Sequence, residues 1–370
     1  MKNILILSDS FPKHGWGGGV IIRSLTEGYP KNLKLFWTTF NINSDTQTCN
    51  EIEVLQFKTT YFRGRGMSSL ILWLESQIFI YNFKKLVEKN KIDLIWVVLG
   101  TSYDKLYRIK HLVKNLSLPI HISVHDDPIL EISKNKRQPA TILFQEILSR
   151  ATSIDVISSR MQQQYKMQYK VNSIVITRCI PQDFPQNNSV NPNFKTILMG
   201  GYGNASPPWP NPMIKAIEKL NRTQNFKLHL FDPKLKPFEN EHVKVHDLIS
   251  EEAFNELLKT VDLGYACDDL NSENLKFSQL SLPTKVITYI GAAIPFVYHG
   301  PKNSTVGDLI NQYEIGIIVD SNNKSDLVDA FLKLQSNYQY YQDNCRLASK
   351  ILFSHKIIQK RFFDNLLKNL

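Results

Sequence analysis

The chain has 370 residues, a formal net charge of +10, 42% hydrophobic residues and 21% charged residues. These values are ordinary for a globular protein of about two domains, each with its own core. Its 4 cysteines are isolated from one another, which argues against a disulfide framework and a zinc site and fits a reducing compartment.

The positive charge bears on the partners of the protein and not on its fold. The lysines are spread along the chain without an Arg-rich tract, so phosphate-bearing substrates or an anionic membrane surface are favoured over nucleic acid. The most apolar window, 67–83, contains Glu75 and Gln77 and is not expected to span a bilayer. The first residues lack the features of a signal peptide. We expect a cytoplasmic protein, either free or peripheral at the inner membrane surface.

The first half of the chain alternates apolar runs with helical patterns. The apolar runs predict strands at 3–8, 33–40, 92–100, 119–125, 153–159 and 173–178. The helical patterns fall at 20–29, 69–90, 104–116, 139–150 and 160–168. Near-continuous apolar strands that alternate with helices indicate a parallel sheet covered on both faces.

A Pro- and Asn-rich stretch at 179–194 predicts a linker, after which the same alternation starts again. Strands are expected at 195–201, 226–232, 243–248, 262–267 and 315–320, and helices near 211–221 and at 251–261. The sequence therefore predicts two doubly wound, Rossmann-like parallel-sheet domains facing across a cleft. We expect an N-terminal domain at 1–180, a linker at 181–194, a second domain at 195–345, and a helical tail at 346–370 able to pack back on the first domain.

A glycine-rich loop follows the first predicted strand and runs into the first helix. Gly17, Gly18 and Gly19 would let backbone N–H groups approach a ligand closely, and the helix start behind them favours an anion. A flexible turn explains the same residues equally well. The spacing matches neither the dinucleotide-binding fingerprint nor a P-loop.

A second candidate loop, "HDDP", follows the strand predicted at 119–125. His125 and Asp126 stand where a buried strand ends, and they could act as acid and base or bind a sugar through hydrogen bonds. The alternative is that Asp126 caps the next turn and His125 is a hydrogen-bonded core residue. The residues alone favour this alternative slightly. His121 is expected to be such a core residue.

The segment "SLPTKVITYIGAAIPFV" at 281–297 combines a helix start with a cation. Pro283 and Thr284 begin the predicted helix, and Lys285 lies in its first turn, where a positive charge is unfavourable by about 0.3–1 kcal/mol. A phosphate at this helix end would explain the lysine, because amide groups and ammonium would then serve one anion. Alternatively, the flexible lysine stem carries its charge to solvent.

The segment "PTKVITYIGAAIPFV" resembles a conserved stretch of the retaining glycosyltransferases of family 4, which have the GT-B fold. Further resemblances follow in the same order: the glycine loop, then "EILSRATSIDVISSRMQQQYKMQY", "EEAFNELLKTVDLGYA" and "EIGIIVD". The match spans most of the chain, although no single motif decides it.

The resemblance implies roles for particular residues. Gly18 and Gly19 would line the donor diphosphate, and His125 would lie near the transferred sugar. Pro283, Thr284 and Lys285 would face the phosphates of the nucleotide sugar. No metal or other cofactor is implied.

The chain also departs from the family pattern. Members commonly carry two glutamates eight positions apart, where this chain has Leu280 and Thr288. The usual Arg and Lys after the first strand of the second domain are missing. Tyr202 or Trp209 of "GGYGNASPPWPN" could stack on a base there, and Arg178 could supply lost charge.

In related enzymes the N-terminal domain binds the acceptor, often a lipid-linked or surface glycan. Basic residues surround the aromatic stretch 67–83, so a face with Trp73, Phe79 and Tyr81 could rest on anionic lipid. A buried core helix with solvated lysines is the favoured alternative.

The leading hypothesis is a glycosyltransferase that moves a sugar from a nucleotide-diphosphate donor, with retention, to a glycan or glycolipid of a surface polysaccharide. A non-catalytic glycosyltransferase-like subunit and a nucleotide-sugar epimerase of related fold are the alternatives.

Overall fold

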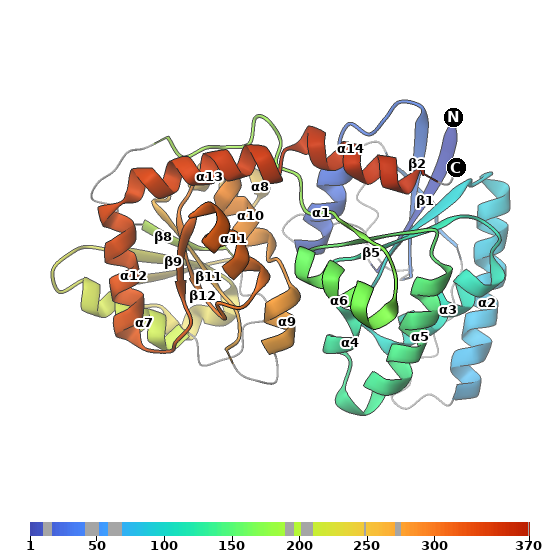
Figure 1. Cartoon of the computed structure of the whole chain (residues 1–370), viewed down its shortest axis with the longest axis horizontal. Helices are drawn as coiled ribbons and strands as arrows, with labels where there is room; N and C mark the ends of the chain where they lie inside the picture. Colours follow the sequence, from blue (N-terminus) through green and yellow to red (C-terminus); the bar gives the residue numbers. More distant parts are fainter. Residues whose placement is uncertain are drawn as a thin grey trace. The chain divides into compact units, whose positions relative to one another are not determined.

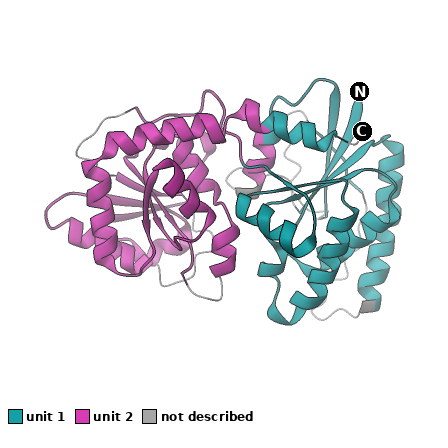
Figure 2. Cartoon of the chain, viewed as in Figure 1, with its two compact units in different colours: residues 1–13, 25–177, 359–370 teal, residues 14–24, 178–358 magenta. Residues whose placement is uncertain are grey.

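The computed structural model describes residues 1–9, 17–40, 52–57, 69–188, 196–200, 210–247, 249–270, 275–368 and 370. Tyr202 and Trp209 lie outside the described residues. The chain divides into two compact units (Figure 2): residues 1–13, 25–177 and 359–370 form unit 1, and residues 14–24 and 178–358 form unit 2.

Unit 1 contains a parallel sheet of seven strands in the order β3-β2-β1-β4-β5-β6-β7 (Figure 1). Its strands are β1 (Lys2–Ser8), β2 (Leu33–Thr39), β3 (Glu53–Val54), β4 (Leu94–Val98), β5 (Ile120–Val124), β6 (Ser153–Val156) and β7 (Ile174–Val175). In β1, Ile4 pairs with Leu35 on one side and Leu94 on the other. The apolar runs form the inner strands because both faces of these strands are buried.

Helices cover the sheet of unit 1. They are α2 (Ser69–Lys89), α3 (Tyr103–Asn115), α4 (Pro128–Glu131), a 3-10 turn η1 (Lys134–Lys136), α5 (Arg137–Arg150) and α6 (Ser159–Tyr169). Helix α1 (Gly17–Thr26) has residues 17–24 in unit 2 and its last two residues in unit 1. Helix α3 packs against both α2 and α5. The last helix, α14 (His355–Leu366), places Phe362 on Trp96 of β4, with ring centroids 4.5 Å apart.

Unit 2 repeats this design with a parallel sheet of six strands in the order β10-β9-β8-β11-β12-β13. The strands are β8 (Thr196–Met199), β9 (Lys227–Phe231), β10 (Val243–His246), β11 (Leu263–Cys267), β12 (Phe296–His299) and β13 (Gly316–Val319). The strand order reverses between β8 and β11, and ligands of open α/β sheets bind beside the carboxyl ends of strands at such a reversal.

The helices of unit 2 lie on both sides of its sheet (Figure 1). They are α7 (Pro210–Leu220), a 3-10 segment η2 (Pro233–Phe238), α8 (Glu251–Leu258), α9 (Leu275–Leu280), α10 (Thr284–Gly291), α11 (Thr305–Tyr313), α12 (Lys324–Ser336) and α13 (Tyr338–Leu352). Helices α7 and α12 pack together, and α10 packs on α13. The predicted fold class, two doubly wound parallel-sheet domains, is confirmed.

Helix α2 has an unusual distribution of side chains. Its exposed face carries a stripe of large apolar residues: Leu70, Ile71, Trp73, Leu74, Ile78 and Tyr81. Its buried face carries Glu75, whose carboxylate accepts a hydrogen bond of 2.5 Å from Arg108 of α3. Phe79 is buried, as the favoured alternative of a core helix predicts, and only Trp73 and Tyr81 of the three aromatic residues considered for lipid contact are exposed. Within the described part of the chain, no helix is long and apolar enough to span a bilayer.

Candidate functional site

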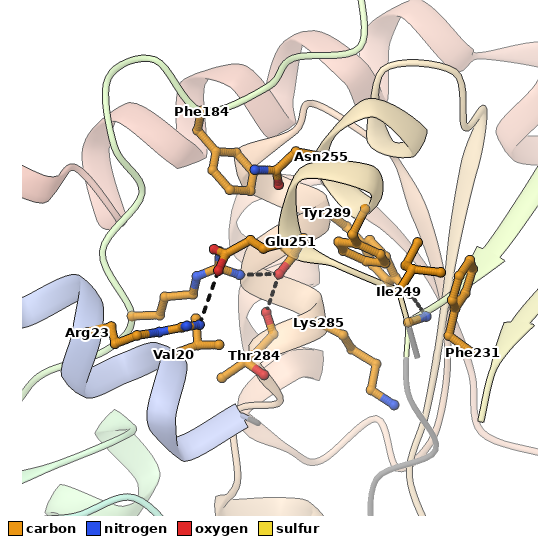
Figure 3. Close-up of a pocket in the computed structure, with 14 residues that line it drawn as sticks. Val20, Arg23, Phe184, Phe231, Ile249, Glu251, Asn255, Thr284, Lys285 and Tyr289 are labelled. Carbon is orange, nitrogen blue, oxygen red and sulfur yellow. Dashed lines mark hydrogen bonds and ion pairs between the residues drawn. The ribbon is translucent and has the colours of Figure 1, made fainter. Parts of the chain in front are cut away.

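A pocket of about 180 Å³ lies within unit 2 (Figure 3). Its wall includes Gly200, which follows β8, and Phe231, the last residue of β9, so it lies where the reversal of strand order predicts a ligand site. Helices α1, α8 and α10 supply most of the other side chains. The lining residues are Val20, Arg23, Arg178, Phe184, Gly200, Phe231, Ile249, Glu251, Phe254, Asn255, Thr284, Lys285, Thr288 and Tyr289.

The start of α10 contributes an amide end and a cation to this pocket. Pro283 is the N-cap residue and supplies no side-chain hydrogen bond to the first turn. Lys285 is half-buried in this turn. Burial raises the pKa of Asp268, just after β11, to about 6, and the ammonium of Lys285 opposes that rise. Lys285 therefore lines the pocket and also has an anionic neighbour within the protein, the carboxylate of Asp268.

Asp268 predicts a specific dependence of stability on pH. Its pKa of about 6 lies above the ordinary value of 3.8, so between these values the native state holds a proton that the unfolded state has lost. The contribution of Asp268 to the free energy of unfolding should therefore fall as the pH rises from about 4 to about 6, by up to about 3 kcal/mol. Urea titrations of the wild type and of Asp268→Asn across this range measure it, because the asparagine variant lacks this fall. If the free energy of unfolding changed with pH in the same way in the wild type and in Asp268→Asn, the prediction would be contradicted.

Tyr289 fixes α10 to the sheet. Its hydroxyl accepts a hydrogen bond of 3.0 Å from the amide of Gly200 and lies 3.0 Å and 3.1 Å from the carbonyl oxygens of Leu198 and Tyr265. Burial raises the pKa of this hydroxyl. The ring packs over Gly264, where an added Cβ would lie 2.6 Å from it. The position of α10, which lines the pocket, thus depends on the buried Tyr289 and on Gly264, which leaves room for its ring.

One side of the pocket is charged. Arg23 of α1 lies 3.3 Å from the carboxylate of Glu251, the first residue of α8. Arg178 donates a hydrogen bond to the hydroxyl of Thr288 on α10. In Figure 3, Arg23 and Glu251 lie on one side and Lys285 points away from them. Arg23, Arg178 and Lys285 bring three positive charges to the pocket wall, against the single carboxylate that its described lining residues include.

The other side of the pocket is apolar and aromatic. Phe231 meets Phe254 edge to face, with ring centroids 5.8 Å apart. The ring of Phe231 also stacks on the imidazole of His246, with ring centroids 4.5 Å apart. Ile249 completes this side (Figure 3). A planar apolar group fits such a wall, while the net excess of two cations among the lining side chains favours an anion.

The structure brings several predicted residues together. Thr284, Lys285 and Thr288 line the pocket, and Pro283 precedes them as the N-cap residue. Gly17, Gly18 and Gly19 form the first turn of α1, and Val20 and Arg23 of this helix line the pocket. Tyr202, the predicted base-stacking residue, lies outside the described residues.

Three functional candidates escaped the sequence analysis. Arg23 lies within a helical pattern that gives no sign of a ligand, and Glu251 follows Ser250 in a sequence typical of a helix start. Phe231 ends a strand and is indistinguishable from a core residue by pattern. Only the order of the strands, which places the ends of β8 and β9 side by side, could have suggested Phe231.

His125 and Asp126 lie in unit 1, directly after β5. His125 is buried, and burial lowers its pKa, so its imidazole is neutral near pH 7. Its Nε2 atom is buried and has no hydrogen-bond partner among the described residues. Asp127, not Asp126, caps the following turn, because its carboxylate accepts the amide hydrogen of Ile129 at 2.9 Å.

A second carboxylate lies at the same edge of the unit 1 sheet. Asp9 follows β1 and accepts a hydrogen bond of 2.6 Å from Lys105 at the start of α3. Burial raises its pKa, and Lys105 opposes this. The strand order of unit 1 reverses between β1 and β4, so Asp9 occupies the ligand-binding edge. His121 is a core residue, as expected, and bonds Ser153 and Asp155.

Comparison with solved structures covers the whole chain. Sucrose-phosphate synthase from Thermosynechococcus elongatus aligns over 100% of this chain and 99% of its own, with a TM-score of 0.75 and 12% identity. The Anabaena protein HepE, solved in complex with UDP and glucose, aligns over 100% of both chains, with a TM-score of 0.69 and 14% identity. The lipopolysaccharide outer core galactosyltransferase WaaB aligns over 100% of both chains, with a TM-score of 0.64 and 14% identity. The chain has the GT-B fold. It matches no protein-family model, and no curated protein sequence matches it.

Each unit of this GT-B chain presents polar groups at the carboxyl edge of its own sheet. Unit 2 offers a cationic and aromatic pocket, and unit 1 offers a neutral imidazole and a lysine-paired carboxylate. Among the described residues no group of His, Cys, Asp or Glu could hold a metal ion. Cys179, Cys267 and Cys345 are buried.

Proposed function

We propose that this GT-B chain is a glycosyltransferase whose donor is a nucleoside diphosphate sugar. The observation that carries the proposal is the pocket of unit 2, whose lining combines aromatic side chains with an excess of two positive charges, one of them Lys285 at the start of α10. A nucleoside diphosphate has the matching parts, a planar base and adjoining phosphates. The HepE structure, which has the same fold, contains UDP and glucose.

The proposal gives the pocket residues distinct roles. Lys285 and the amide end of α10, with Pro283 and Thr284, bind phosphate, and Thr288 lies one turn further along the helix. Gly17, Gly18 and Gly19 would add amide groups at the start of α1. Tyr202 keeps its predicted role of stacking on the base. Neutralising the charge of the departing diphosphate in this way stabilises the transition state.

His125 and Asp126 are proposed to orient the sugar during transfer with retention. A neutral imidazole whose Nε2 atom has no partner among the described residues can donate a hydrogen bond to a sugar hydroxyl or accept one from it. The acceptor is proposed to be a glycan or lipid-linked intermediate of a surface polysaccharide in the cytoplasm. The apolar stripe of α2, with Trp73 and Tyr81 exposed and Lys85 over the ring of Tyr81 at 4.3 Å, supports contact with an anionic lipid surface.

A panel of nucleotide sugars and nucleoside diphosphates tests this function. One nucleoside diphosphate should raise the Tm at a concentration far above its Kd, because it binds only the native state. Its sugar conjugate should release the diphosphate slowly by hydrolysis and faster when a suitable acceptor is added. His125→Ala should lose this turnover and keep the rise in Tm.

The same panel separates the alternatives. Binding without release of diphosphate under any acceptor condition would favour a non-catalytic glycosyltransferase-like subunit, for which Thr288 in place of a family glutamate is the supporting observation. Conversion of the sugar without an acceptor would indicate an epimerase. Absence of any shift in Tm across the panel would contradict the donor site.

A further inference from the structure

Arg178 is held in place by two neighbouring residues, Phe184 and Thr288. Its guanidinium lies over the ring of Phe184, 5.2 Å from the centroid, and donates to the Thr288 hydroxyl. That hydroxyl in turn donates to the carbonyl oxygen of Thr284 at 2.9 Å. The guanidinium is therefore fixed against Thr288 of α10, one turn after the start of this helix.

The negative charge of Glu251 acts on two arginines. Burial lowers the pKa of Arg178 to about 10, and the charge of Glu251 opposes this while Arg23 adds to it. Arg23 itself lies 3.3 Å from the same carboxylate. The carboxylate thus balances one of the two positive charges.

The two arginines and the glutamate differ in their freedom to move. The side chain of Arg23 is 10% exposed and that of Glu251 is 41% exposed. Arg178 is fixed by Phe184 and Thr288. Glu251 is the first residue of α8, and its side chain is therefore the more exposed member of the pair with Arg23. A diphosphate carries more charge than a carboxylate and offers several oxygens to planar guanidinium groups.

We propose that Arg23 and Arg178 bind the diphosphate of the donor, which displaces Glu251 from them. This inference rests on the proposed function. Arg23 and Arg178 would supply the positive charge that the Arg and Lys missing from the loop after β8 supply in the family pattern. Before the donor binds, Glu251 acts as an internal anion that offsets part of the positive charge of the two guanidinium groups. The pocket then accepts a diphosphate by an exchange of ion-pair partners.

The exchange predicts that removing the negative charge of Glu251 strengthens the binding of diphosphate and that removing the positive charge of Arg178 weakens it. With Glu251→Gln the net charge of the lining side chains rises from +2 to +3, since Arg23, Arg178 and Lys285 stand against Glu251. The variant should have a lower Tm without ligand, because the arginines lose their counter-ion, and should bind diphosphate about fivefold more tightly. Arg178→Gln should bind diphosphate at least about tenfold more weakly, because a charge-assisted hydrogen bond is lost.

Calorimetric titration with inorganic pyrophosphate and with UDP tests the exchange without reference to the sugar. Glu252→Gln and Arg222→Gln are matched controls, since both residues are exposed in unit 2 and neither lines the pocket. Both should keep the wild-type Kd within about twofold. Arg178→Lys, which keeps the charge and loses the planar fork, should fall between the wild type and Arg178→Gln and covers a failure of the glutamine variant to fold.

Weaker or unchanged pyrophosphate binding by Glu251→Gln would overturn the inference, because a displaced anion can only compete. So would unchanged binding by Arg178→Gln, or no binding of either probe by the wild type. A protein that turns over a nucleotide sugar with these variants at wild-type Kd would refute the exchange and leave the proposed function intact. A protein that binds pyrophosphate with the expected pattern and releases no sugar would refute the proposed activity alone.

Discussion

Replacing Lys285 with methionine is expected to weaken the binding of a nucleoside diphosphate by about 10- to 100-fold. The methionine keeps most of the apolar stem and removes only the ammonium group, which supplies a charge-assisted contact of about 1.5–3 kcal/mol to phosphate. The binding of the corresponding nucleoside, which lacks phosphate, should change by less than about threefold. Isothermal titration of both ligands measures the two effects separately.

Lys276→Met is the matched control for this substitution. Lys276 is an exposed cation on α9 and does not line the pocket, so its loss lowers the net charge of unit 2 equally without removing a phosphate contact. An equal loss of affinity in both variants would show that Lys285 acts through general electrostatic attraction alone. Loss of nucleoside binding with Lys285→Met would instead show that the pocket itself had changed.

The position of Lys285 at a helix start has two physical explanations, a phosphate of the ligand and an anionic neighbour within the protein. The ammonium of Lys285 opposes the rise in the pKa of the half-buried Asp268 carboxyl. The same carboxylate accepts a hydrogen bond of 2.9 Å from the Tyr298 hydroxyl. An anionic partner inside the protein therefore offsets part of the unfavourable position of a lysine at a helix start. This neighbour could not be predicted, because Asp268 is 17 positions away in the sequence and the helix α9 between them breaks the simple alternation.

The fold was predictable because the strands are buried on both faces. The residues of β4 and β11 and the centre of β1, residues 4–7, form such buried runs, which are typical of a parallel sheet with helices on both sides. Short elements escaped the analysis for a physical reason. Helix α9 has six residues and α11 has nine, too few turns for a clear periodic pattern.

The candidate site was predictable only where one local signal sufficed. A lysine at a helix start can be recognised from four consecutive residues, and so can a glycine loop. The contact between Arg178 and Thr288 joins residues 110 positions apart, and the pair formed by Arg23 and Glu251 joins α1 to α8. Such contacts follow from the assembly of unit 2 around its sheet and have no signature in the sequence.

Replacing Glu75 with glutamine is expected to lower the free energy of unfolding by about 3–5 kcal/mol. Glu75 and Arg108 are 0% and 2% exposed, and the neutral amide would leave the guanidinium of Arg108 buried without its counter-ion. Urea-induced unfolding followed by circular dichroism measures this loss. Glu53→Gln, which removes an exposed partner of Lys34 in the same unit, should cost less than about 1 kcal/mol.

The double variant Glu75→Leu with Arg108→Met separates the cost of an isolated charge from the value of the pair. Because removing both charges also removes both desolvation penalties, its stability should return to within about 1 kcal/mol of the wild type or exceed it. A double variant as unstable as Glu75→Gln would show that the pair contributes net stability to the packing of α2 on α3. In that case the apolar stripe on the opposite face of α2 would be presented by a helix that depends on its buried charges to stay in place.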